Sequence, residues 1–185
     1  MASKQVLREV YLAKRLTLTE EEYGRRNELI LNKVLALIAE VNPLIIHFFL
    51  PIKSKREIDL TSVIDQFPSS KFVIPKTESN GELKHFIFNS ETKMLQNKWG
   101  IMEPQEGIEV DPKDIDLVIV PLIIADKLGH RIGYGKGYYD RFLAKIEALK
   151  VGVSLQPLLD KIDYSEATDV ELDKVITPYE QRIIS

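Results

Sequence analysis

The feature that most constrains the fold lies between residues 116 and 149, where an apolar run, a cluster of glycines and a helical pattern follow one another. Residues 116–125 are almost continuously apolar, which predicts a parallel strand that is buried on both faces. Four glycines fall within the nine positions 129–137, and residues 138–149 have the spacing of a helix. This order is typical of the ligand-binding edge of an open α/β sheet.

The rest of the chain alternates helical and strand patterns. Helices are predicted from Ser3 to near Leu16 and, behind a capping box of Thr19 and Glu22, from there to Asn42. Strands are predicted over 44–50, 71–75, 83–88, 150–154, 174–176 and 182–184, with a short helix ending near 67 and a loop-rich segment over 91–113. We therefore expect one domain over 1–185 with a Rossmann-like three-layer α/β architecture, an open and largely parallel sheet with helices on both faces.

Composition excludes several classes of site. The 185 residues include no cysteine, which rules out disulfides, thiolate zinc sites, iron–sulfur clusters and a cysteine nucleophile. The net charge of −3 argues against binding of duplex nucleic acid. The first residues lack the apolar core of a signal peptide, and no window approaches the apolar length of a membrane span. We expect a cytoplasmic monomer that binds small molecules, not nucleic acid or membranes.

The glycine cluster has the chemistry of a phosphate site. Glycines allow successive backbone N–H groups to converge on an anion, and Arg131 and Lys136 add full positive charges. The P-loop is excluded because Gly137 follows Lys136 where that motif needs Ser or Thr, and the glycine spacing does not match the dinucleotide fingerprint. The alternative is a flexible connection whose glycines serve only as turns.

The same segment resembles a known family. Gly-His-Arg-Ile-Gly-Tyr-Gly-Lys-Gly-Tyr-Tyr-Asp-Arg-Phe-Leu, at 129–143, is similar to the signature of the 5-formyltetrahydrofolate cyclo-ligases, also called methenyltetrahydrofolate synthetases. Companion motifs follow in the family's order: Lys4-x-x-x-Arg8, Glu57-Ile58-Asp59, Ile74-Pro75-Lys76, Trp99-Gly100-Ile101-x-x-Pro104 and Glu171-Leu172-Asp173. The resemblance implies a C–N bond-forming ligase that uses ATP and Mg²⁺ to convert 5-formyltetrahydrofolate to 5,10-methenyltetrahydrofolate. The formyl oxygen would attack the γ-phosphoryl group, and N10 would then close the ring, with release of ADP and phosphate.

The resemblance also implies a set of ATP-binding residues. These are Lys4, Arg8, Arg131, Ile132, Gly133, Tyr134, Gly135, Lys136, Gly137, Tyr138 and Tyr139. Lys136 and Arg131 are the predicted catalytic residues, because their charges suit phosphate oxygens. Lys4 and Arg8 are four residues apart and would share one face of the first helix. Without the resemblance, these two would be read as solvated surface cations.

Metal and folate contacts follow from the same resemblance. Asp140 and Asp173 are the predicted Mg²⁺ ligands. Without the resemblance, Asp140 could equally be a ligand or a helix N-terminal acid, and Asp173 would be an ordinary surface acid. The predicted folate contacts are Leu50, Glu57, Trp99, Tyr134 and Tyr138. The segment 51–56 is longer than is usual in the family, so the contact could be Leu50, Pro51 or Ile52. Its cations could meet the glutamate tail of a folate or be solvated.

Other readings remain open from the residues alone. His47 lies in an apolar run and is interpreted as a core residue, and no metal-ligand spacing of histidines is present. A nucleotide- or phosphometabolite-binding module without turnover is the main alternative function. A sugar-phosphate enzyme is a weaker one, because the sequence offers no acid–base pair for it.

Overall fold

The computed structural model describes residues 3–97, 100–163 and 168–185, and its centre is a seven-stranded sheet. The strands, in their order across the sheet, are β11 (Gln181–Ile183), β10 (Lys174–Ile176), β9 (Leu149–Val153), β6 (Leu117–Pro121), β1 (Ile45–His47), β2 (Lys71–Thr77) and β3 (Leu83–Phe88). The five inner strands are parallel, and β3 and β11 are antiparallel at the two edges.

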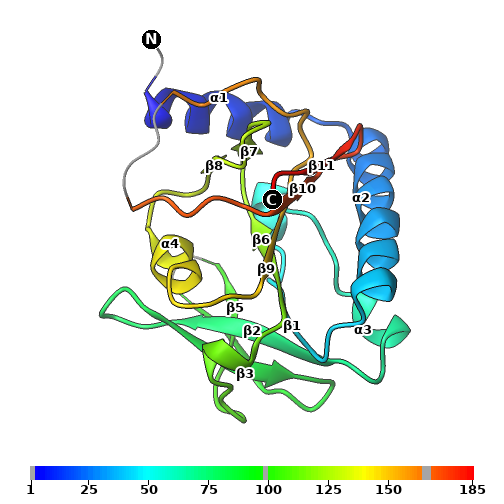
Figure 1. Ribbon diagram of the computed structural model, residues 1–185, viewed down its shortest axis with the longest axis vertical. Helices are drawn as coiled ribbons and strands as arrows, with labels where there is room; N and C mark the ends of the chain where they lie inside the picture. Colours follow the sequence, from blue (N-terminus) through cyan, green and yellow to red (C-terminus); the bar gives the residue numbers. More distant parts are fainter. Residues whose placement is uncertain (1–2, 98–99, 164–167) are drawn as a thin grey trace.

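Helices cover both faces of this sheet. In Figure 1, α2 (Glu20–Val41) and α4 (Tyr138–Leu143) lie on opposite sides of the central strands, and α1 (Lys4–Leu16) crosses one end. Alternate residues of β6 divide between the two cores: Leu117 and Ile119 pack in the cluster under α2, and Val118 and Val120 pack in the cluster under α4. The predicted fold class, a largely parallel α/β sheet with helices on both faces, is confirmed.

Local chemistry explains where the long helices begin and end. Ser3 Oγ accepts a hydrogen bond from the backbone N–H of Val6, and Thr19 Oγ1 accepts one from that of Glu22. The other half of the predicted capping box is wrong, because the Glu22 carboxylate accepts from the guanidinium groups of two following arginines instead. Among the described residues, no helix is both long and apolar enough to cross a bilayer.

Several short elements differ from the sequence predictions. The predicted helix over 138–149 ends at Leu143, because residue 149 already begins β9. The apolar run 116–125 is divided: β6 ends at Pro121, and residues 124–125 pair with residues 131–132 as the hairpin of β7 (Ile124–Ala125) and β8 (Arg131–Ile132). The segment 91–113 contains a two-stranded ribbon. The strands of this ribbon are β4 (Met94–Gln96) and β5 (Met102–Pro104). The remaining short helices of the described chain are η1 (Lys53–Lys55), α3 (Val63–Gln66) and η2 (Pro112–Asp114).

The connections of the sheet reverse direction at β1. From β1 the chain moves to β2 on one side, whereas β6, which pairs with β1 on its other side, leads to β9 and β10. Open α/β sheets bind ligands at such a point, beyond the carboxyl ends of the strands. The loops that follow β1 and β6 are therefore placed to form a site.

Gly129 is required by a close backbone approach at the β7–β8 turn. Its φ is +89°, and a Cβ there would lie 2.8 Å from the carbonyl oxygen of Leu172. We expect Gly129→Ala to lower the free energy of unfolding by about 1–3 kcal/mol, because both the backbone conformation and the contact become strained. Urea titration measures this loss.

Gly24→Ala is the matched control for that substitution. Gly24 lies within α2, and a Cβ there would meet nothing within 4 Å. We expect a gain of about 0.5–1 kcal/mol, because alanine restricts the unfolded chain and favours the helix. Equal effects of the two substitutions would contradict the assignment of a close contact at Gly129.

Candidate functional site

A cavity of about 960 Å³ lies at the carboxyl ends of β1, β2 and β6. Its volume is in the range of sites for small-molecule ligands, roughly 300–1,000 Å³. Among the described residues, six cationic side chains and four acidic ones line it, together with apolar side chains. The charged side chains are Lys4, Arg8, Lys55, Arg131, Lys136, Arg141, Glu57, Glu103, Asp140 and Asp169. The cavity thus joins a charged region to an apolar one.

The charged region is built by the glycine loop, residues 133–137, and by α1. Arg8 Nε donates to the carbonyl oxygen of Gly133 at 2.8 Å. Gly135 has a φ of +82°, and a Cβ there would lie 2.8 Å from a terminal nitrogen of Arg8. Glycine at this position therefore allows the guanidinium to lie against the loop. The exposed Lys136 ammonium has no hydrogen-bond or ion-pair partner in the part of the chain that the structure describes.

Two further cations of the cavity are held by carboxylates. Arg131, whose side chain is 7% exposed, pairs with Asp140 and donates to the carbonyl oxygen of Val170. Burial lowers the pKa of Arg131, and the charge of Asp140 opposes that change. Lys4 Nζ pairs with Asp169 at 2.6 Å. These pairs fix the cations at the wall of the cavity before any anion is bound.

A buried carboxylate lies at the junction of the charged and apolar regions. Glu57 is 4% exposed; its Oε2 accepts from the backbone N–H of Ile52 at 2.8 Å and its Oε1 accepts from the Tyr134 hydroxyl at 2.6 Å. Burial and the charge of Glu57 raise the pKa of Tyr134, so the hydroxyl keeps its proton and donates. Because Tyr134 belongs to the glycine loop, this bond connects the loop to the segment after β1.

Comparison with known proteins shows which family the chain is similar to. Residues 1–178 match the sequence profile of the 5-formyltetrahydrofolate cyclo-ligase family. The chain belongs to that family. The resemblance seen in the glycine loop is thereby confirmed, and the chain is an enzyme of the cyclo-ligase family.

Relatives of known name cover most of the chain. A 5-formyltetrahydrofolate cyclo-ligase from Mycoplasma genitalium is 30% identical, over 95% of this chain and 98% of the relative. A probable 5-formyltetrahydrofolate cyclo-ligase from Schizosaccharomyces pombe is 32% identical, over 67% of this chain and 70% of the relative. The solved structure of a 5,10-methenyltetrahydrofolate synthetase from Aquifex aeolicus is similar with a TM-score of 0.86 and 32% identity, covering 98% of this chain and 92% of that one.

Most of the site residues predicted from the cyclo-ligase resemblance line this same cavity. They are Lys4, Arg8, Leu50, Glu57, Arg131, Ile132, Gly133, Tyr134, Gly135, Lys136, Gly137, Tyr138, Tyr139 and Asp140. Of the three residues considered for the folate contact after β1, Leu50 and Ile52 line the cavity. Trp99 lies outside the described residues, so its predicted folate contact stays a prediction.

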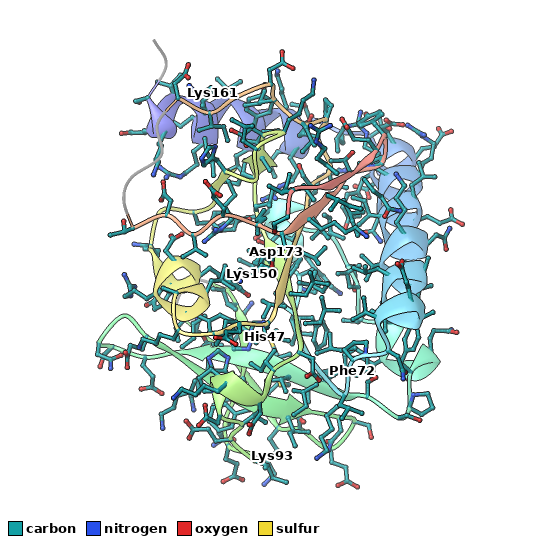
Figure 2. The ribbon with its side chains drawn as sticks, in the orientation of Figure 1. His47, Phe72, Lys93, Lys150, Lys161 and Asp173 are labelled. Atoms are coloured by element: carbon teal, nitrogen blue, oxygen red, sulfur yellow. The ribbon has the colours of Figure 1, made fainter. Side chains whose placement is uncertain are left out.

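Asp173 is not brought together with Asp140. Its Oδ2 accepts from the backbone N–H of Lys150 at 2.7 Å, and Figure 2 shows these two residues side by side. Asp173 precedes β10 and Lys150 lies near the start of β9, so Asp173 is at the amino ends of the parallel strands, whereas the cavity lies at their carboxyl ends. Among the described residues, no three His, Cys, Asp or Glu side chains form a metal-holding group.

Glu103 and Asp169 line the cavity, and Arg15 contacts Tyr134 of its lining, but none of the three was foreseen from the sequence. Glu103 is 8% exposed and accepts two hydrogen bonds from Thr77. In the sequence it occupies one of the two x positions of the motif Trp-Gly-Ile-x-x-Pro, for which no residue type was specified. Asp169 carried no signal beyond the acidic composition of the C-terminal segment. Arg15 is buried, whereas Val6 and Val10 of the same helix are more than 40% exposed.

Tyr139 of the cavity lining belongs to a buried aromatic cluster in which several polar atoms lack partners among the described residues. His47 is fully buried, in the interior of the molecule in Figure 2, and its ring lies 5.2 Å from that of His85 and 6.0 Å from that of Tyr139. Within the described chain, both His47 nitrogens, His85 Nδ1 and the Tyr139 hydroxyl have no hydrogen-bond partner. The interpretation of His47 as a core residue agrees with this burial. Burial lowers the pKa of His85 to about 4 and the pKa of His47 well below its ordinary value.

These lowered pKa values predict a loss of stability in acid. Both histidines stay neutral in the folded protein at pH 6, whereas in the unfolded chain they take up protons below about pH 6.5. The free energy of unfolding therefore falls as the pH falls below 6.5, by about 1.4 kcal/mol per pH unit for each histidine, until the folded-state pKa is reached. Urea unfolding between pH 7 and pH 4.5 measures the slope. We expect His85→Phe to reduce it, and an unchanged slope would contradict the assignment.

Proposed function

We propose that this enzyme converts 5-formyltetrahydrofolate to 5,10-methenyltetrahydrofolate, with ATP converted to ADP and phosphate. The observation that supports this most is the composition of the cavity. It is lined both by Lys136 of the glycine loop, which has no partner among the described residues, and by the buried, hydrogen-bonded carboxylate of Glu57. The first feature suits a triphosphate, and the second suits a pterin. A cyclisation driven by ATP needs both ligands in contact.

The nucleotide is assigned to the charged region of the cavity. Lys136 and Arg8 lie at the glycine loop without a carboxylate partner among the described residues, so their charges are available to phosphate oxygens. Arg131 and Lys4 would exchange part of their contact with Asp140 and Asp169 for the phosphates. Such exchange keeps the cations in place while the anion binds, which lowers the cost of ordering them.

A magnesium ion fits this region only together with the nucleotide. Asp140 and Asp169 line the cavity, and Mg²⁺ is usually held by one or two carboxylates with substrate phosphates and water. We propose Asp140 as its protein ligand, with Asp169 the nearest candidate for a second in place of Asp173. When bound, the ion would neutralise charge on the transferring phosphoryl group.

The pterin is assigned to the apolar region beside Glu57. The Glu57 carboxylate can accept hydrogen bonds from adjacent N–H donors of a flat heterocycle, as carboxylates do in bidentate contacts. Leu50, Tyr134 and Tyr138 line the same region and offer apolar and aromatic surface. Lys55 lies 4.2 Å above the Tyr134 ring, so one cation of the segment 51–56 also reaches the cavity.

The proposed reaction has two steps that balance. The formyl oxygen attacks the γ-phosphorus, ADP leaves, and the carbon becomes a good electrophile that carries a phosphate. N10 then attacks this carbon, loses its proton, and the carbon–oxygen bond breaks to release phosphate with the former formyl oxygen. The described residues supply positioning and charge neutralisation, through Lys136, Arg131 and Glu57, and no covalent bond to the protein is formed.

The activity is tested by mixing purified protein with 5-formyltetrahydrofolate and Mg-ATP. We expect the ultraviolet absorbance of the methenyl product to appear, and to require both substrates. Binding of ATP by calorimetry with no product at saturating folate would contradict the proposal and would favour a binding module without turnover.

A further inference from the structure

Arg15 occupies an unusual place for a charged side chain. Within α1, all of which is described, Arg15 is the only buried residue, at 4% exposure. No carboxylate of the described chain lies within ion-pair distance of it, although a buried charge is costly unless it is compensated. Its position therefore requires an explanation other than the packing of α1.

The hydrogen bonds of Arg15 lead to the glycine loop. One terminal nitrogen donates to the Tyr134 hydroxyl, and the other donates to the carbonyl oxygen of Leu122 at 3.4 Å. The guanidinium also lies 5.7 Å from the centre of the Tyr134 ring. Nε is buried and has no partner among the described residues. Tyr134 is thus the main polar contact of this cation.

The chemistry of the guanidinium fixes the direction of the next bond. A guanidinium only donates, so the Tyr134 oxygen must accept from Arg15 and use its own proton elsewhere. That proton is donated to Glu57 Oε1 at 2.6 Å, while the backbone N–H of Ile52 donates to Oε2. Two successive hydrogen bonds through the Tyr134 hydroxyl therefore connect the Arg15 guanidinium to the buried carboxylate of Glu57.

We propose that Arg15 is a positioning residue for the folate site, acting on Glu57 through Tyr134. This rests on the function proposed above, in which Glu57 contacts the pterin. Arg15 holds the Tyr134 hydroxyl as an oriented donor, and this donor holds the Glu57 carboxylate with its remaining acceptor positions toward the cavity. Arg8, on the same helix, contacts the loop at Gly133 instead, so the loop keeps a contact with α1 that does not involve Arg15.

Arg15→Met tests this role without leaving a buried charge. Methionine has similar length and no donors, and replacing an imperfectly compensated buried charge by an apolar group does not lower stability as a rule. We expect the thermal midpoint to be kept, the KM for 5-formyltetrahydrofolate to rise roughly tenfold, and the KM for ATP and kcat to change less than about twofold. Lys14→Met, the same change at the exposed neighbouring residue, should leave all of these values unchanged.

A double-mutant cycle shows whether Arg15 acts through the hydroxyl. Tyr134→Phe removes only that group, and we expect it to raise the folate KM by a similar factor. The double variant should be no worse than the more affected single variant, because both changes break one path. Multiplying effects, or an ATP KM that rises as much as the folate KM, would overturn the proposal. Calorimetry of 5-formyltetrahydrofolate with the wild-type protein distinguishes failure of this proposal from failure of the proposed function. No binding and no turnover by the wild type would refute the proposed function itself.

Discussion

Lys136→Ala is expected to abolish most turnover while the protein stays folded. The lysine is exposed on the glycine loop and has no partner among the described residues, so its removal deletes no contact of the core. Its charge would act on the transferring phosphoryl group, and removing one such group costs roughly 10²–10³ in rate. We expect kcat/KM for ATP to fall by that factor in steady-state assays. The free energy of unfolding should change by less than about 0.5 kcal/mol.

Lys113→Ala is the matched control for the loss of this charge. Lys113 is an exposed cation of η2, which precedes β6 and so lies toward the amino end of that strand, whereas the cavity lies at its carboxyl end. Its substitution should leave both kinetics and stability unchanged. An unfolded Lys136→Ala protein, or one with full activity, would contradict the assignment of Lys136 to the phosphates.

Glu57→Gln is expected to have the second large effect, on the folate. Glutamine has the same shape, but its amide group cannot accept at both positions, so it would oppose the donor of either Ile52 or Tyr134. The contact with the pterin would also lose its charge. Two charge-assisted hydrogen bonds are involved, and we expect kcat/KM for 5-formyltetrahydrofolate to fall about a hundredfold or more. Steady-state kinetics with the folate as varied substrate measures the fall.

Glu21→Gln makes the same change of charge on an exposed residue of α2. It should leave the kinetics of both substrates as they are in the wild type. If Glu57→Gln instead raised the KM for ATP as much as that for the folate, Glu57 would be a residue that supports the whole cavity and not a folate contact.

The parts of the fold that were predicted correctly are those that depend on local patterns. The spacing of apolar residues and the caps at Ser3 and Thr19 predicted α1 and α2, and continuous apolar character predicted the buried strand β6. The β7–β8 hairpin was not predicted, because the apolar run 116–125 looks uniform in sequence, although β6 ends at Pro121 and residues 124–125 pair with residues 131–132. The end of α4 at Leu143 was not predicted either. Propensity is a weak guide where tertiary contacts decide the boundary.

The same distinction applies to the site. The glycine loop is contiguous, so its residues could be assigned together, and they lie together in the cavity. Glu103 and Asp169 join it only through the fold, from the β4–β5 ribbon and from the C-terminal segment. Arg15 was missed because a helix with a buried arginine has no signal in hydrophobic periodicity. Asp173 was chosen from an acidic motif, but it directly precedes β10 and so lies at the amino ends of the parallel strands, away from the cavity.

The central claim is that ATP activates the formyl oxygen in this cavity, and isotope transfer tests it most directly. 5-Formyltetrahydrofolate labelled with oxygen-18 in its formyl group is converted by the wild-type enzyme with Mg-ATP, and the released phosphate is examined by mass spectrometry. The proposed reaction predicts one labelled phosphate and one ADP for each methenyl product. Unlabelled phosphate with the label found in water, or product formed without ADP, would contradict it.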